Sequence, residues 1–202
     1  MEGYGEVMEH KELEIIKVNQ EYGGNQYHFR HPIMNRGGCS TVAACHAAAM
    51  LAHKDPARSA LYPYDQLYIS QTEFTKFADR MYRFVAPGFR GMAETHLFER
   101  GFEKFAKAQG VEVRFESLQG DASFEEARAM IHRLIDNGIG VQYLLLRHTN
   151  PIFDEIEWHW FTVTGYHDNE IIYSTWGERR TADLKLLWDT GHNEKGGLIA
   201  VL

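Results

Sequence analysis

The segment that begins at residue 39 constrains the fold of this chain more than any other. Residues 39–52 are rich in alanine and carry apolar side chains at positions all round a helix. Alanine is the strongest helix former, and a helix that is apolar on every side must be covered on every side. We therefore predict a buried helix here, enclosed by elements that the rest of the chain must supply.

The first residue of this segment is a cysteine. Gly37 and Gly38 precede Cys39, and glycine adopts positive φ at little steric cost, so we predict a sharp turn into the helix. A thiol in the first turn lies at the positive end of the helix dipole, which favours the reactive thiolate. The alternative is that Cys39 is a small buried apolar residue. Cys45, farther along the same helix, is interpreted as core packing.

Length and composition limit the other possibilities. A chain of 202 residues with 44% hydrophobic content is expected to form one domain over 1–202, with a polar and flexible segment at 1–11. The net charge of -7, without a basic run, argues against nucleic acid or an acidic membrane surface as a partner. No apolar stretch approaches the ~20 residues of a membrane span.

The same features bear on location. Two cysteines are too few for a disulfide framework, which indicates a reducing compartment. The N-terminus lacks the pattern of a secretory signal peptide. We expect a cytoplasmic protein, or one exported without a classical signal peptide, and leave its oligomeric state open.

Helix signals dominate the first two thirds of the chain. Capping boxes at Ser70–Glu73 and Ser123–Glu126 are expected to open helices over 71–84 and 124–136. An amphipathic pattern predicts a third helix over 92–109.

Strand signals are short in the first half and stronger in the second. We expect strands at 12–18, 26–29, 111–115, 141–146, 158–165, 171–175 and 198–202, with a hairpin between 165 and 171 and a loop over 188–197. Helices followed by mostly antiparallel strands predict an α+β fold, with a helical half and a sheet half.

One of the eleven histidines stands out by its position. His159 lies in Trp-His-Trp-Phe-Thr-Val-Thr-Gly-Tyr, a strand pattern, and a strand holds a general base more firmly than a loop does. A cysteine on a helix that faces a histidine on a strand can form a thiolate–imidazolium pair. The imidazole then protonates a leaving amine.

These motifs occur in a recognisable order. Gly-Gly-Cys-x-x-x-Ala-Ala is followed by His-Trp-Phe-Thr-Val-Thr-Gly-Tyr and then by Ile-Ile-Tyr-Ser-Thr-Trp-Gly. This order resembles the papain-like cysteine peptidases, and within them the bacteriocin-leader (double-glycine) peptidases and their stand-alone bacterial relatives. The resemblance covers roughly 33–202. It implies a papain-like α+β fold, with the nucleophile helix packed on a C-terminal sheet, and no cofactor.

The resemblance also implies roles for individual residues. Cys39 would be the nucleophile and His159 the general base and acid. Asn35 stands upstream of the cysteine, where the family has an oxyanion-hole glutamine, and the backbone N–H of Cys39 would be the second donor. Ser174 stands where the family has the Asp or Asn that orients the imidazole. Glu178 or another acid is an alternative for that role.

The expected activity is the hydrolysis of an amide bond in a peptide or protein substrate, through a thioacyl-enzyme at Cys39. Four alternatives stay open: deamidation of a protein glutamine, cleavage of a peptidoglycan amide, cysteine-based acyl transfer, and a non-catalytic module that binds peptides. Substrate choice depends on cleft shape, which no sequence motif here specifies.

The remaining candidates have simpler interpretations. Trp158, Trp160 and Trp176 are expected in the core or in a cleft wall, and the resemblance implies that Trp176 shields the Cys–His pair. His46 is interpreted as a polar residue with its hydrogen bonds satisfied.

Two further groups of residues are candidates for ligand sites. His28 and His31 flank an aromatic residue without a cysteine or acid cluster, so no metal site is predicted. The acidic loop Asp154, Glu155 and Glu157 is either solvated surface or the mouth of a cleft that favours basic substrates.

Overall fold

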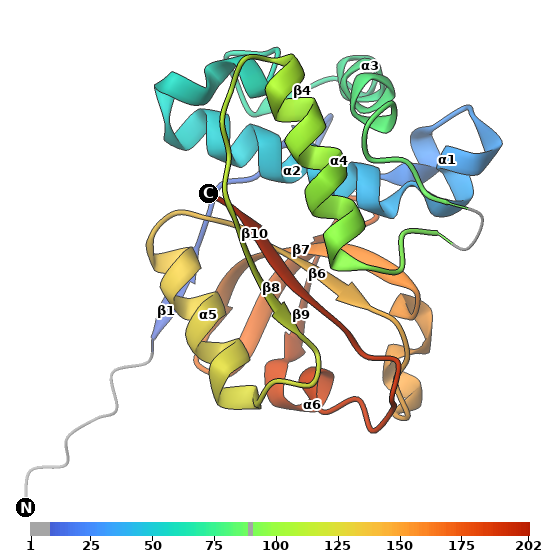
Figure 1. Ribbon diagram of the computed structural model, residues 1–202, viewed down its shortest axis with the longest axis vertical. Helices are drawn as coiled ribbons and strands as arrows, with labels where there is room; N and C mark the ends of the chain where they lie inside the picture. Colours follow the sequence, from blue (N-terminus) through green and yellow to red (C-terminus); the bar gives the residue numbers. More distant parts are fainter. Residues whose placement is uncertain (1–8, 89–90) are drawn as a thin grey trace, which may run out of the picture.

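The computed structural model describes residues 9–88 and 91–202 and has two parts (Figure 1). Helices α1 to α4 form the upper part in this view, and a sheet with helices α5 and α6 forms the lower part. The α-helices are α1 Pro32–Gly37, α2 Cys39–Lys54, α3 Gln71–Tyr82, α4 Thr95–Ala108, α5 Phe124–Asp136 and α6 Leu184–Trp188. The 3-10 helices are η1 Gln26–His28, η2 Pro56–Leu61 and η3 Pro151–Ile156.

Within the described residues, the main sheet has seven strands in the order β5-β10-β6-β7-β8-β9, with β1 paired to β7 beside this path. Every pairing in it is antiparallel. Its strands are β1 His10–Glu12, β5 Phe115–Gln119, β6 Val141–Leu145, β7 His159–His167, β8 Glu170–Thr175, β9 Glu178–Asp183 and β10 Gly196–Val201. A small sheet joins β3 Glu21–Tyr22, β2 Lys17–Val18 and β4 Tyr68–Ile69. The α+β class predicted from the sequence is confirmed.

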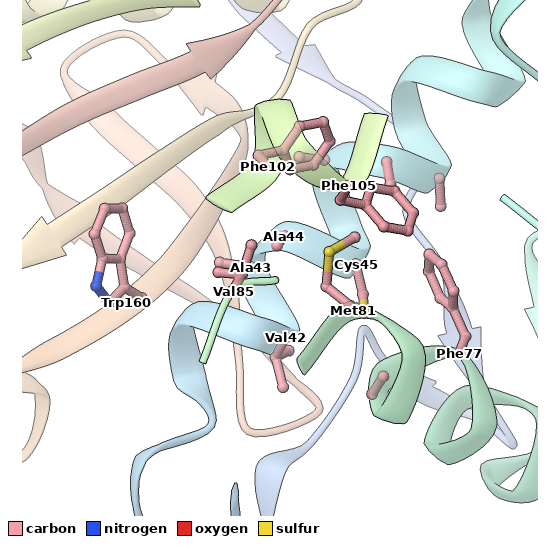
Figure 2. Close-up of a cluster of buried hydrophobic side chains, with 14 of the residues drawn as sticks. Val42, Ala43, Ala44, Cys45, Phe77, Met81, Val85, Phe102, Phe105 and Trp160 are labelled. Carbon is pink, nitrogen blue, oxygen red and sulfur yellow. The ribbon is translucent and has the colours of Figure 1, made fainter. Parts of the chain in front are cut away.

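Helix α2 is the buried centre of the molecule, as its sequence predicts. All of its residues from Cys39 to Leu51 are buried. It contacts α3 and α4 on one side and strands β6, β7 and β10 on the other. Figure 2 shows Cys45 inside this cluster, close to Met81 of α3, so Cys45 is a core residue as expected.

The sheet is covered on both faces. Trp160 of β7 and Leu144 of β6 belong to the core around α2, whereas Phe161 and Tyr143 belong to a second core beneath α5 and α6. Neighbouring strand residues point to opposite faces, which explains why every residue of β6 is buried. The histidine strand is therefore held between two packed layers.

Both predicted capping boxes form. Ser70 Oγ accepts from the N–H of Glu73 at 3.2 Å, while Glu73 Oε2 accepts from the N–H of Ser70 at 2.8 Å. Ser123 and Glu126 repeat the arrangement at the start of α5. The predicted hairpin of β7 and β8 is also confirmed.

Several local predictions are wrong. The strand expected at 26–29 is absent from these described residues: residues 26–28 form the 3-10 helix η1, because the Asn25 side chain accepts from the N–H of Tyr27 and starts a helical turn. The strand expected at 111–115 begins only at Phe115, and α6 and β9 were not anticipated.

The prediction that residues 1–11 are flexible is wrong for the last residues of this segment. Residues 1–8 lie outside the described part of the chain. His10 and Lys11 belong to β1, which pairs with β7. Among the described residues, no helix has the length and apolar character to cross a membrane.

Candidate functional site

Cys39 and His159, far apart in the sequence, line the same cleft. The cleft has a volume of about 930 Å³ and lies where the start of α2 meets the start of β7. Gln26, Trp158 and Trp176 also line it. The helix-borne thiol and the strand-borne imidazole that the sequence suggests as partners therefore border one cleft.

The turn before Cys39 differs from the prediction. Gly38 has φ -77°, so positive φ is not the reason for glycine here. A Cβ at this position would lie 2.3 Å from the carbonyl oxygen of Met34. Glycine is needed because α1 runs into α2 with too little room for a side chain.

Burial determines the protonation of Cys39. Desolvation raises the pKa of its thiol, and the backbone N–H groups of Trp160, Ser40 and Cys39 oppose this only in part. Burial therefore opposes the thiolate that the helix N-terminus favours, and it favours the protonated thiol. The helix end is present, but the loss of water outweighs its field.

His159 is the first residue of β7, and its ring is fixed on two sides. Its Nε2 lies 2.7 Å from Oγ1 of Thr175, at the end of β8. Its ring stacks on Trp176 with centroids 4.4 Å apart. Burial, with a smaller contribution from the nearby Arg180 guanidinium, lowers the pKa of His159 to about 3. The ring is neutral at physiological pH.

Ser174 does not contact this imidazole. Its Oγ donates to the carbonyl oxygen of Tyr22 at 2.7 Å. Ser174 and Thr175 are adjacent on β8 and point to opposite sides of the strand, so only Thr175 reaches His159. The prediction that Ser174 contacts the imidazole is therefore wrong, and Thr175 is the residue that makes this contact.

The acid proposed as a substitute for that role is engaged elsewhere. Glu178 pairs with Arg180 at 2.8 Å, and Arg180 lies 5.0 Å from the Trp176 ring centroid. The guanidinium therefore covers the indole that stacks on His159.

Asn35 is also placed differently from the prediction. Its Nδ2 donates to the carbonyl oxygens of Tyr27 at 3.0 Å and Phe29 at 3.2 Å, which uses both amide hydrogens. The side chain joins α1 to the end of η1 and does not line the cleft. The prediction of Asn35 as an oxyanion donor is corrected for this reason.

Gln26 is a site residue that the sequence reasoning missed. It is only 6% exposed and lines the cleft. Its Nε2 donates to the carbonyl oxygens of Asn35 and Arg36, both at 3.1 Å, while its Oε1 is buried without a partner in the described part of the chain. The prediction of a strand over 26–29 gave no reason to consider Gln26 as a site residue. The sequence signal that could have identified it is the preceding turn, Gly23 to Asn25.

No protein-family model and no curated protein matches this sequence. The chemistry of the site follows from its geometry. A buried thiol and a buried, neutral imidazole line the same cleft, and a hydroxyl and an indole hold the imidazole. Such a pair can transfer a proton and form a covalent bond to an electrophilic carbon.

His46 lies behind the cleft and is satisfied, as expected. Its Nε2 accepts from the N–H of Gly24 at 2.8 Å, and its Nδ1 lies 3.0 Å from Oγ1 of Thr162. Burial lowers the pKa of His46 to about 3. The neutral ring ties the turn before η1 to α2 and β7.

The two histidines considered for a metal site, His28 and His31, contact different residues. His28 Nε2 is 3.3 Å from Glu21 Oε1, and the His31 ring packs against Tyr82. Residues 9–88 and 91–202 contain no group of three or more His, Cys, Asp or Glu side chains able to hold a metal ion.

Proposed function

We propose that this protein is a papain-like cysteine hydrolase that cleaves an amide bond, with a peptide or protein as substrate. The observation that supports this most is the shared cleft of Cys39 and His159, with His159 hydrogen-bonded to Thr175 and stacked on Trp176. A nucleophile, a base and a group that orients the base are the components of nucleophilic catalysis.

The proton transfers follow from the tautomer of His159. We assign the tautomer in which Nε2–H donates to the Thr175 hydroxyl, which leaves Nδ1 to accept the proton of the Cys39 thiol. As Sγ bonds to the substrate carbonyl carbon, Nδ1 takes the thiol proton and then gives it to the leaving amine. Water, deprotonated by the same nitrogen, releases the acid and restores the thiol. Because both groups begin neutral, proton transfer accompanies attack.

Two groups would bind the substrate around this step. The backbone N–H of Cys39, in the first turn of α2, would donate to the oxyanion. The buried Oε1 of Gln26 would accept an N–H from the substrate backbone, since the Gln26 amide hydrogens are already used. A peptide provides such an N–H beside the scissile bond.

The test is a panel of peptides, proteins with reactive glutamines, and muropeptides, assayed with wild type, Cys39→Ala and His159→Ala. We expect cleavage of a peptide bond by wild type alone. Ammonia release from glutamine or cleavage of a muropeptide would redirect the proposal to a deamidase or an amidase that uses the same pair. Amide product from an added amine would indicate acyl transfer.

A non-catalytic peptide-binding module is the second candidate. It is favoured by the raised pKa of Cys39 and by a hydroxyl in the orienting position, which stabilises an imidazolium less than a carboxylate would. Alkylation by iodoacetamide, followed residue by residue with mass spectrometry, separates the two. An enzyme requires Cys39 to react much faster than Cys45, which lies in the core; equal slow rates would exclude catalysis.

A further inference from the structure

Trp158, the residue before His159, has an unusual backbone. In the part of the chain that the structure describes, four non-glycine residues have positive φ: Asn19, Trp158, Asp168 and Trp176. Asparagine and aspartate tolerate this conformation, whereas a bulky side chain is strained in it. Both strained residues are tryptophans, and both flank His159. Strain of this kind is maintained at sites where it serves a function.

The conformation of Trp158 is held by its neighbours. Its N–H donates to the carbonyl oxygen of Leu146 at 3.0 Å, just beyond the end of β6. The guanidinium carbon of Arg147 lies 5.9 Å from the centroid of its ring. The turn at φ +54° thus fixes the direction of the indole immediately before the candidate base.

That direction leaves the indole open to the cleft. Trp158 is 42% exposed and lines the cleft with two other exposed apolar residues, Tyr27 at 60% and Ile33 at 53%. Open apolar surface beside reactive groups is typical of a ligand-binding site. A strained residue that exposes an aromatic ring there is better explained by binding than by packing.

The carboxylates of the acidic loop that line the cleft already have partners within the protein. Glu155 and Glu157 do line the cleft, which was one of two alternatives for the acidic loop. Both are engaged: Glu155 Oε2 lies 3.0 Å from Arg180 Nη1, and Glu157 Oε1 accepts from the backbone N–H of His148 at 2.6 Å. Among the residues that the structure describes, the other charged side chain that lines the cleft is Arg36, a cation.

We propose that the indole of Trp158 is the platform for a bulky apolar side chain, and that the substrates carry an aromatic or large aliphatic residue beside the scissile amide. This inference rests on the proposed function and specifies its substrate class. Trp158 contacts the substrate side chain and sets specificity, while Cys39 and His159 perform the chemistry.

The test compares the alkylation of Cys39 by iodoacetamide, by its N-benzyl derivative and by its N-(2-aminoethyl) derivative, with N-acetylcysteine as the reference thiol. Stacking of an aromatic group on the indole should raise the benzyl-to-iodoacetamide rate ratio about threefold to tenfold above that of the reference. Trp158→Gly, which removes both the indole and the strain, should return the ratio to the reference value. Its unfolding midpoint should not fall, because glycine adopts positive φ freely.

Ile152→Ala is the matched control, because Ile152 is an apolar residue that is 66% exposed and does not line the cleft. It should keep the wild-type ratio. A benzyl preference that persists in Trp158→Gly would overturn the inference, as would a faster reaction with the aminoethyl reagent than with the benzyl reagent.

A second measurement does not depend on thiol reactivity. In Cys39→Ala, the capped tripeptide acetyl-Gly-Phe-Gly-amide should bind about threefold to tenfold more tightly than acetyl-Gly-Lys-Gly-amide, and Trp158→Gly in that background should abolish the difference. Equal affinities would refute the platform. Neither measurement requires hydrolysis, so a preference for the aromatic probe without any amide cleavage would leave the platform standing and refute the enzyme.

Discussion

Replacement of Thr175 by valine tests the arrangement of the candidate site most directly. Valine has nearly the shape of threonine, so packing at this buried position is kept while the hydroxyl is lost. The 2.7 Å hydrogen bond to His159 Nε2 then has no replacement, because both side chains are buried and water has little access. The imidazole loses the contact that selects its tautomer.

The magnitude follows from that geometry. A neutral hydrogen bond contributes about 1 kcal/mol net, and a buried donor left unsatisfied costs about 1–3 kcal/mol. At about 1.4 kcal/mol for each factor of ten, Thr175→Val should lower kcat/KM roughly 10-fold to 100-fold. Thr175→Ser keeps the hydroxyl and should recover most of the activity.

Ser174→Ala is the matched control on the same strand. It removes the hydrogen bond to Tyr22, which should cost about 1 kcal/mol of unfolding free energy and leave kcat/KM nearly unchanged. Steady-state hydrolysis of the best peptide from the substrate panel, with urea unfolding of each variant, measures both quantities. Full activity in Thr175→Val, or a loss in Ser174→Ala as large as the one expected for Thr175→Val, would refute the assignment of the orienting role.

Three further predictions follow from the same contacts. Because burial keeps His159 neutral and Cys39 protonated, kcat/KM for peptide hydrolysis should be nearly flat from about pH 5 to about pH 8; an acidic limb near pH 6.5 in the pH–rate profile would contradict the buried neutral pair. Gln26→Ala should lower kcat/KM about tenfold in steady-state assays, whereas Asn35→Ala should leave it unchanged and cost about 1–2 kcal/mol in urea unfolding; the reverse pattern would restore Asn35 to the site. Burial lowers the pKa of His46 and of His159 from the ordinary value of 6.5 to about 3, so below pH 6.5 the unfolded chain binds protons that the folded chain does not. Unfolding free energy measured in guanidinium should therefore fall as the pH drops from about 6.5 toward 3, by up to about 1.4 kcal/mol per pH unit for each ring, and less steeply in His46→Phe; an equal slope in that variant would show that His46 is not the source.

Much of the candidate site was readable in local sequence. Cys39 followed from a glycine pair before an all-round apolar helix, and His159 from a strand pattern that ends in Gly-Tyr. These patterns can be recognised in a single sequence because they are formed by side chains that are neighbours along the chain. The same is true of the two capping boxes, which formed as predicted.

The residues that surround Cys39 and His159 could not be predicted from the sequence. Ser174 and Thr175 are adjacent hydroxyl residues, and only the register of β8 against β7 decides which of them faces His159. Gln26 and Asn35 are both amides upstream of Cys39 that donate to backbone carbonyls, and only the packing of η1 against α1 places Gln26, and not Asn35, at the cleft.

The protonation states were decided by tertiary structure as well. The sequence determined where the thiol and the imidazole sit, namely at the start of a buried helix and at the start of a buried strand. It could not determine how much water they keep, because desolvation is produced by elements from the whole chain that close over them. Helix position alone predicts a thiolate at Cys39, whereas burial in the folded chain favours a neutral thiol there and a neutral imidazole at His159.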